Sequence, residues 1–143
     1  MEEASGAQQA PLNQNEPRPM DKHAFQRLTA YLGKIPAVIM LGTGTYSTGL
    51  WWVKLQIDIE HQAAWRVVQE LGCVLNYLSV SERLPTVFYP VSPAPYLNGG
   101  PAEFLAWIIE AQQVDFTPDI LLEWLDGRLP QPVDDLTQWV APE

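Results

Sequence analysis

The chain has 143 residues, of which 47% are hydrophobic, and it carries a formal net charge of −9 at pH 7. This length and apolar content predict one globular domain, and the lack of clustered Lys and Arg argues against nucleic acid or an anionic membrane surface as a partner. No apolar run approaches the ~20 residues that cross a bilayer, and the single cysteine, Cys73, excludes an internal disulfide.

Residues 1–20 are rich in Gln, Asn and Pro, and we expect them to form a flexible tail before a single domain over residues 21–140. A helix is predicted to follow the tail directly. Asp21 can cap its first turn and Gly33 can end it. Its buried face is predicted from the helical spacing of Phe25, Leu28 and Leu32.

Two strands joined as an antiparallel hairpin are predicted next. Residues 35–41 (IPAVIML) form a short apolar run, which is typical of a strand buried on both faces. Residues 50–58 alternate instead, and the alternation places Trp52 on the polar face of an otherwise regular strand. The residues predicted to face the core are Trp51, Val53, Leu55 and Ile57.

The glycine-rich stretch at residues 41–49 (LGTGTYSTG) begins like the loop with which protein kinases cover ATP phosphates. The position of the third glycine holds Ser47, however, and Gly49 comes two residues late. The chain has no H-R-D, D-F-G or Walker motif, and a strand is predicted after the glycines. We therefore interpret the stretch as a hairpin loop of roughly eight residues whose glycines adopt positive φ.

A second helix is predicted over residues 59–82, with Asp58 as its N-cap and a wide apolar face. A glycine inside a helix costs about 1 kcal/mol relative to Ala, so Gly72 is expected where another backbone packs closely. Cys73 is expected to act as a small hydrophobe within this apolar helix.

Residues 84–91 (LPTVFYPV) predict a third strand, and Pro90 favours a place at the edge of the sheet. A proline-rich segment follows, and it is either a pre-ordered binding surface or a structural cover. Pro101 then predicts the start of a helix over residues 101–113. The residues expected to face inward from it are Phe104, Leu105, Ile108 and Ile109.

The last helix is predicted to start at Thr117-Pro118-Asp119 and to end at Gly127. The predicted element order is α-β-β-α-β-α-α. This order indicates an α+β fold, in which a small antiparallel sheet of about three strands packs against helices.

Charge is unevenly distributed along the chain. From Leu84 to the end there are nine acidic residues and one basic residue, Arg128, whereas the preceding part is almost neutral. An acidic half favours a partner protein with a basic surface, because complementary charge speeds encounter. The alternative is that the acidic residues only keep a small protein soluble.

Aromatic residues and acidic residues near the C-terminus supply the candidate contacts. Aromatic side chains flank the proline-rich segment, and tryptophan is enriched at interface hot spots. Asp134 and Asp135 belong either to a capped turn that folds Leu136 and Trp139 onto the domain or to a short acidic peptide that docks into a partner. The candidate partner-binding residues are Trp52, Tyr89, Tyr96, Asp134, Asp135 and Trp139.

No constellation for catalysis stands out. Cys73 has no histidine near it on its helix face, and no G-x-S-x-G motif occurs. Asp58, Glu60 and His61 are suitable metal ligands, but no second His or Cys lies at ligand spacing, so capping is the preferred interpretation. The sequence therefore predicts no catalytic, metal or cofactor residues.

Taken together, these features predict a soluble, acidic protein that is not embedded in a membrane. It is expected to bind another protein as an accessory factor, for example in assembly or regulation. The alternative is a small-molecule-binding protein or enzyme with a site between the glycine-rich loop and the proline-rich loop.

Residues 37–139 resemble small uncharacterised proteins of oxygenic photosynthetic microbes. The resemblance is carried by WWVKLQIDIEHQAAWRVVQELGCVLNYLS, LPTVFYPVSPAPYLNGGP, FTPD and EWLDGRLPQPVDDL, and it leaves out the N-terminal tail. It implies an accessory role in the cytoplasm or at the periphery of a photosynthetic membrane complex, and it brings no activity or catalytic residue with it.

Overall fold

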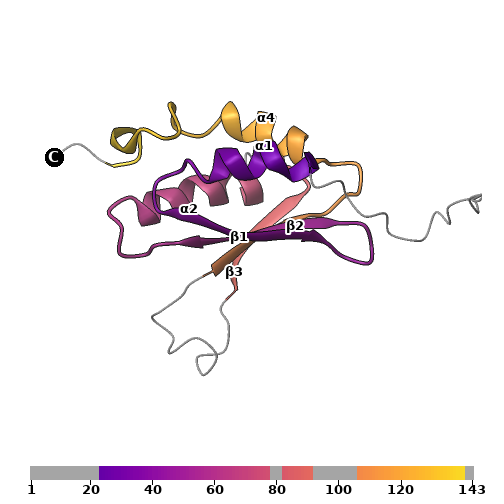
Figure 1. Cartoon of the computed structure of the whole chain (residues 1–143). Coiled ribbons are helices and arrows are strands. Elements are labelled where there is room, and N and C mark those ends of the chain that lie inside the picture. Colours follow the sequence, from indigo (N-terminus) through magenta and orange to yellow (C-terminus); the bar gives the residue numbers. More distant parts are fainter. Residues whose placement is uncertain (1–22, 78–81, 92–105, 141–143) are drawn as a thin grey trace, which may run out of the picture.

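Helices cover one face of a four-stranded antiparallel sheet in the computed structural model, which describes residues 23–77, 82–91 and 106–140 (Figure 1). The elements are α1 (His23–Leu32), β1 (Val38–Thr45), β2 (Trp51–Ile57), α2 (Ala64–Gly72), a π-helical turn η1 (Cys73–Tyr77), β3 (Thr86–Val91), β4 (Ala106–Ala111), α4 (Pro118–Asp126) and a 3-10 turn η2 (Leu136–Gln138). The α+β class is as predicted. Among the described residues the element order is α-β-β-α-β-β-α, in which β4 takes the place of a predicted helix.

The sheet has the strand order β1-β2-β4-β3, and each neighbouring pair is antiparallel. The helix predicted over residues 101–113 is wrong, because residues 106–111 form β4 in the middle of this sheet. A short apolar run is equally compatible with a buried helix or a buried strand. Pairing with β2 on one side and β3 on the other decides in favour of the strand. Phe104 and Leu105 lie outside the described residues.

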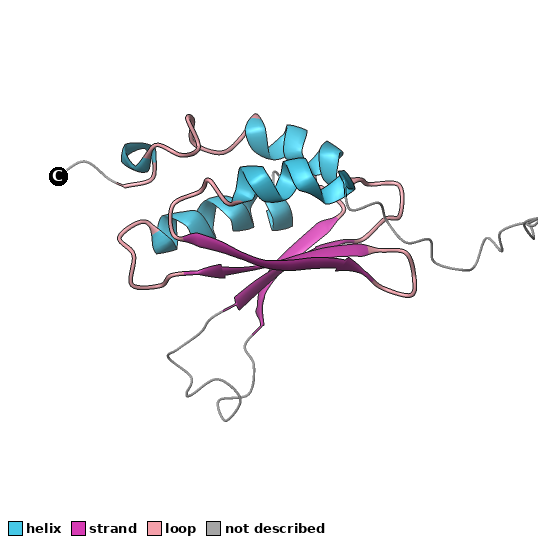
Figure 2. Cartoon of the chain, viewed as in Figure 1, coloured by secondary structure: helices cyan, strands magenta, loops and turns pink. Residues whose placement is uncertain are grey.

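The core lies between the sheet and the helices, and α4 packs alongside α1 (Figure 2). The predicted alternation of β2 is confirmed, because Trp51, Val53, Leu55 and Ile57 are buried. The predicted face of α1 is also confirmed, since Phe25, Leu28 and Leu32 are buried. Trp51 joins the layers: its ring meets that of Phe25 edge-on at 6.0 Å, and its Nε1 donates a 2.6 Å hydrogen bond to the Phe116 carbonyl.

β1 differs from its prediction as a strand buried on both faces. Ile39 and Leu41 are 53% and 42% exposed, because β1 is an edge strand and no helix in the described ranges covers the second face of the sheet. The register with β2 shifts between Met40 and Gly42, so Leu41 lies at a β-bulge.

The start of α2 also differs from its prediction. Asp58 caps a preceding turn, in which its Oδ1 accepts a hydrogen bond from the Glu60 amide (3.1 Å), and the helix itself begins at Ala64. Gly72 has no neighbouring atom within 4 Å of the position that a Cβ would occupy, so the expected close backbone contact is absent there. Cys73 is exposed and does not fill the core as a small hydrophobe.

β3 lies at the sheet edge, as Pro90 predicts, and the chain itself protects that edge. The side chain of Asn76, from η1, donates to the Phe88 carbonyl (2.9 Å) and accepts from the Phe88 amide (2.8 Å). The buried Thr86 hydroxyl donates to the Leu75 carbonyl (2.7 Å). The two Asn76 bonds satisfy backbone groups of Phe88 that an edge strand otherwise offers to another chain, and the Thr86 bond ties η1 to β3.

α4 has the predicted limits. The Thr117 hydroxyl accepts a hydrogen bond from the Ile120 amide (3.2 Å), Pro118 occupies the first turn, and Gly127 follows the last residue. Beyond α4, Trp139 is only 1% exposed, and its Nε1 donates to the Val133 carbonyl (2.9 Å). The C-terminal segment therefore folds back onto the domain, as one of the two interpretations predicts.

Candidate functional site

The face of the sheet opposite the helices carries most of the exposed aromatic and aliphatic side chains that the strands contribute. We call it the open face, because no described helix lies over it (Figure 2). The strand registers place the following side chains on it: Ile39 from β1, Trp52, Lys54 and Gln56 from β2, Val87, Tyr89 and Val91 from β3, and Ile108 and Glu110 from β4. Tyr46, in the loop between β1 and β2, reaches onto it as well.

Glu110 lies near the middle of the open face and holds two tyrosines. The Tyr89 hydroxyl donates to its Oε1 at 2.9 Å, and the Tyr46 hydroxyl donates to its Oε2. Three separate parts of the chain therefore meet at one carboxylate: the hairpin loop, β3 and β4. The two phenols remain 39% exposed, so the cluster is open to a ligand.

The hydrogen bonds to Glu110 favour the neutral form of both phenols. The pKa of Tyr46 rises from 10.0 to about 12, chiefly because its hydroxyl donates to the negatively charged carboxylate. The pKa of Tyr89 is also raised, first by partial desolvation and then by the same carboxylate. Both tyrosines thus remain hydrogen-bond donors at neutral pH.

Trp52 lies on the same face, half-buried, with its indole ring over Gly44. A Cβ at Gly44 would come within 2.6 Å of the Trp52 Cζ2, so glycine makes room for the ring. Gly42 and Gly44 belong to β1 and do not adopt positive φ, which corrects their interpretation as turn residues. Gly49, with φ of 90°, does fulfil that role.

The structure brings together only part of the predicted contact set. Trp52 and Tyr89 share the open face, whereas Tyr96 lies outside the described residues. Trp139 is buried and is not available as a surface contact, and the C-terminal segment runs on the helical side of the sheet (Figure 1). Asp135 caps η2: its Oδ1 accepts from the Thr137 hydroxyl (2.7 Å) and amide (3.0 Å), and these bonds lower the pKa of its carboxyl.

Two members of the open face were missed by sequence reasoning. Tyr46 was counted as part of a turn, and Glu110 was placed in a helix that does not form. The sequence offered two signals: Tyr46 is a tyrosine directly after a strand, and Glu110 is a single acid in an apolar run. Only the strand register shows that the two residues meet.

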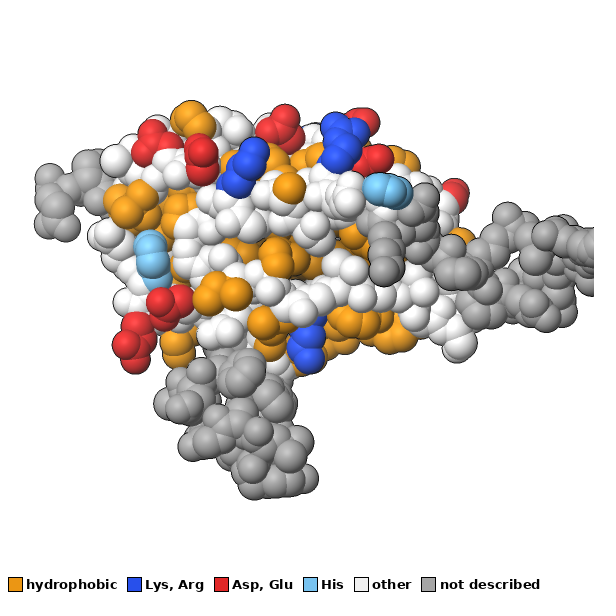
Figure 3. Space-filling model, in the orientation of Figure 1, with side chains coloured by type: hydrophobic (Ala, Val, Ile, Leu, Met, Phe, Trp, Pro, Cys, Tyr) orange, Lys and Arg blue, Asp and Glu red, His pale blue; other side chains and the backbone are white. Residues whose placement is uncertain are grey.

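Surface composition distinguishes the two sides of the molecule. Figure 3 shows acidic and basic side chains side by side at the top, over the helices, further acidic side chains at the lower left, and hydrophobic side chains along the lower layer, where the sheet lies. An exposed surface that mixes aromatic and aliphatic groups with a few polar ones is typical of interaction sites.

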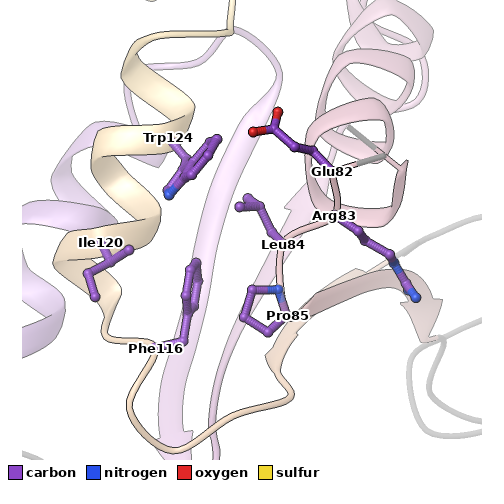
Figure 4. A pocket seen from close by; sticks show the side chains of 7 residues that line it. All are labelled: Glu82, Arg83, Leu84, Pro85, Phe116, Ile120 and Trp124. Atoms are coloured by element: carbon purple, nitrogen blue, oxygen red, sulfur yellow. The ribbon is translucent and has the colours of Figure 1, made fainter. Parts of the chain in front are cut away.

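A cavity of 480 Å³ lies elsewhere, between α4 and the segment that leads into β3 (Figure 4). Leu84, Pro85, Phe116 and Trp124 make its wall mainly apolar. The Arg83 side chain points away from it, and its Nε donates to the Asn76 carbonyl. This is not the place predicted for a small-molecule site, and neither Lys54 nor His61 lines it.

The described ranges contain neither a candidate metal site nor a helix that could span a membrane. Residues 23–77, 82–91 and 106–140 contain no group of three or more His, Cys, Asp or Glu side chains that could hold a metal ion. The helices of these ranges are all too short or too polar to cross a bilayer.

Comparison with known proteins adds no family to this picture. No protein-family model matches the chain, and neither a curated protein nor a solved structure matches it significantly.

Proposed function

We propose that the protein is a non-catalytic accessory factor that binds another protein through the open face of its sheet. The observation that carries the proposal is an aliphatic and aromatic surface that no described helix covers, on which Ile39, Tyr46 and Tyr89 are each 39–53% exposed. Burying such exposed apolar side chains against a partner lowers the free energy of the complex.

The composition of the open face supports a protein as the partner. Trp and Tyr offer a large contact area with few rotatable bonds, and both are enriched at interface hot spots. Trp52 and Tyr89 lie on neighbouring parts of a rigid sheet, and little conformational entropy would be lost on binding. The net charge of −9 favours a partner with a basic surface over a second copy of the same chain.

The most direct experiment places a photo-crosslinking amino acid at Ile39 in the full chain. The matched control places it at Trp65 on α2, which is 57% exposed on the helical side. Each protein is irradiated in an extract of its native cells, and the crosslinked partner is then purified and titrated against the unmodified chain. A partner that crosslinks from position 39 and not from position 65 supports the proposal.

Three results contradict it. Equal crosslinking from positions 39 and 65 means that the open face is not special. A product of twice the chain mass identifies a second copy as the occupant. Crosslinking within one chain, with no increase in mass, means that another part of the chain covers the face.

A further inference from the structure

We propose that Glu110, Tyr46, Tyr89 and Trp52 form a subsite for a basic side chain of the partner, with an arginine or lysine placed against the Glu110 carboxylate. This inference rests on the proposed function and specifies the chemistry of the same surface.

The Glu110 carboxylate has capacity to spare for such a ligand. An ionised carboxylate offers about four acceptor positions, and the hydroxyls of Tyr46 and Tyr89 occupy one on each oxygen. Both phenols are neutral donors, so the cluster keeps the negative charge of the carboxylate. A cation can therefore add to the cluster without displacing either tyrosine.

That charge is not neutralised by a neighbouring base in the described part of the chain. The ion pairs there join Arg27 to Asp119 and Arg66 to Glu70, both on the helical side. Lys54 lies opposite Ile108, two residue pairs along from Trp52 and Glu110 and therefore on the same face, but it forms no ion pair with Glu110. The carboxylate is thus a fixed negative charge on an aromatic surface.

Aromatic rings beside a carboxylate suit a cation better than a neutral group. The face of a Trp or Tyr ring attracts an ammonium or guanidinium group, and a planar guanidinium also stacks on it. The chain itself contains such a contact on its helical side, where the Arg128 guanidinium lies 4.0 Å from the centre of the Trp124 ring. Trp52 is paired with Glu110 across β2 and β4 and presents its side chain on the same face, with its ring held over Gly44 of β1.

The test uses two peptides that differ only in charge. One is acetyl-Ala-Arg-Ala-Arg-Ala-amide, and the other has citrulline in place of each arginine. Each is titrated into the full-length protein at constant ionic strength, while NMR follows the Trp52 indole N–H and the Glu110 amide. We expect saturable shifts with the arginine peptide and roughly 5- to 10-fold weaker binding of the citrulline peptide.

Two variants with the same change of net charge separate a subsite from general attraction. Glu110→Gln removes the carboxylate at the proposed subsite, and Glu123→Gln removes an exposed one on α4. We expect roughly 3- to 5-fold weaker arginine-peptide binding for Glu110→Gln and less than about a 1.5-fold change for Glu123→Gln. Equal binding of the two peptides, or equal effects of the two variants, would overturn the inference.

The same variants separate this inference from the proposed function. If Ile39 crosslinks its partner equally well in the wild-type and Glu110→Gln proteins, the open face binds a partner but the basic-side-chain subsite is wrong. If crosslinking is lost in Glu110→Gln and kept in Glu123→Gln, both proposals stand.

Discussion

Replacing Gly44 with alanine tests the packing that holds Trp52 on the open face. The new Cβ would lie 2.6 Å from Cζ2, 2.8 Å from Cε2 and 3.0 Å from Nε1 of the Trp52 indole. Carbon atoms pack best at about 3.5–4.0 Å, so the ring must move by about 1 Å. Gly42 is a matched control on the same strand and face, where the nearest atom of Trp52 would be 4.0 Å from the new Cβ.

Two opposing effects set the expected change in the free energy of unfolding of these variants. Neither glycine has positive φ, so alanine at either position is free of backbone strain and gains about 0.5–1 kcal/mol from a less flexible unfolded chain. At Gly44 this gain is outweighed by the overlap, which costs about 1–3 kcal/mol, nearer the lower value because Trp52 is half-exposed. Because the gain is common to both variants, we expect Gly44→Ala to be less stable than Gly42→Ala by about 1–1.5 kcal/mol, or about 4–6 °C in Tm.

Urea denaturation followed by circular dichroism measures the difference, and NMR of the Trp52 indole N–H reports the movement of the ring. Gly44→Ala should shift this resonance, whereas Gly42→Ala should leave it close to its wild-type position. Equal stability of the two variants, together with an unmoved indole resonance in Gly44→Ala, would refute the described contact between Trp52 and β1.

Three other predictions concern the phenol cluster, a helix cap and the core. The pKa of Tyr46 is raised from 10.0 to about 12, so the stability that its neutral phenol contributes is complete below pH 10 and is lost as the pH rises through 12. Glu110→Gln should return this pKa towards 10 and remove the alkaline loss of stability. ¹³C NMR of the Tyr46 ring measures the pKa, and urea denaturation in the alkaline range measures the stability. Thr117→Ala should destabilise the protein by about 1 kcal/mol and Thr117→Ser by much less, because serine keeps the N-cap hydrogen bond of α4. If urea denaturation gives the two variants the same free energy of unfolding, the cap contributes nothing. Trp51→Phe should lower the free energy of unfolding by about 2–4 kcal/mol, because it removes buried volume and leaves the Phe116 carbonyl without its donor. A decrease of less than about 1 kcal/mol in urea denaturation would contradict the buried hydrogen bond.

Local patterns are sufficient for the elements whose side chains repeat at one clear period or carry a complete cap. The spacing of Phe25, Leu28 and Leu32 predicts α1, and strict alternation from Trp51 to Ile57 predicts β2 and the outward direction of Trp52. Thr117-Pro118 and Gly127 mark α4 because capping depends only on residues within one turn.

Tertiary structure decided the elements whose local pattern allows two answers. Residues 106–111 form a short, mostly apolar run that suits a helix or a strand, and pairing of their backbone groups with β2 on one side and β3 on the other makes them a strand. Ile39 and Leu41 are as hydrophobic as core residues, and their exposure follows from the position of β1 at an edge, where no described helix lies over its second face.

The same distinction applies to the candidate site, where local patterns predict some residues and tertiary structure decides which residues meet. The sequence by itself determined the chemistry that Trp52 and Tyr89 bring and the face on which Trp52 lies, because alternation is a local property of a strand. It could not determine that Tyr46, Tyr89 and Glu110 meet, since they are separated by up to 64 residues and are joined only by the register of β2, β3 and β4. The physical reason is that contacts between distant strands depend on pairing and on which faces remain uncovered, and these are properties of the assembled sheet.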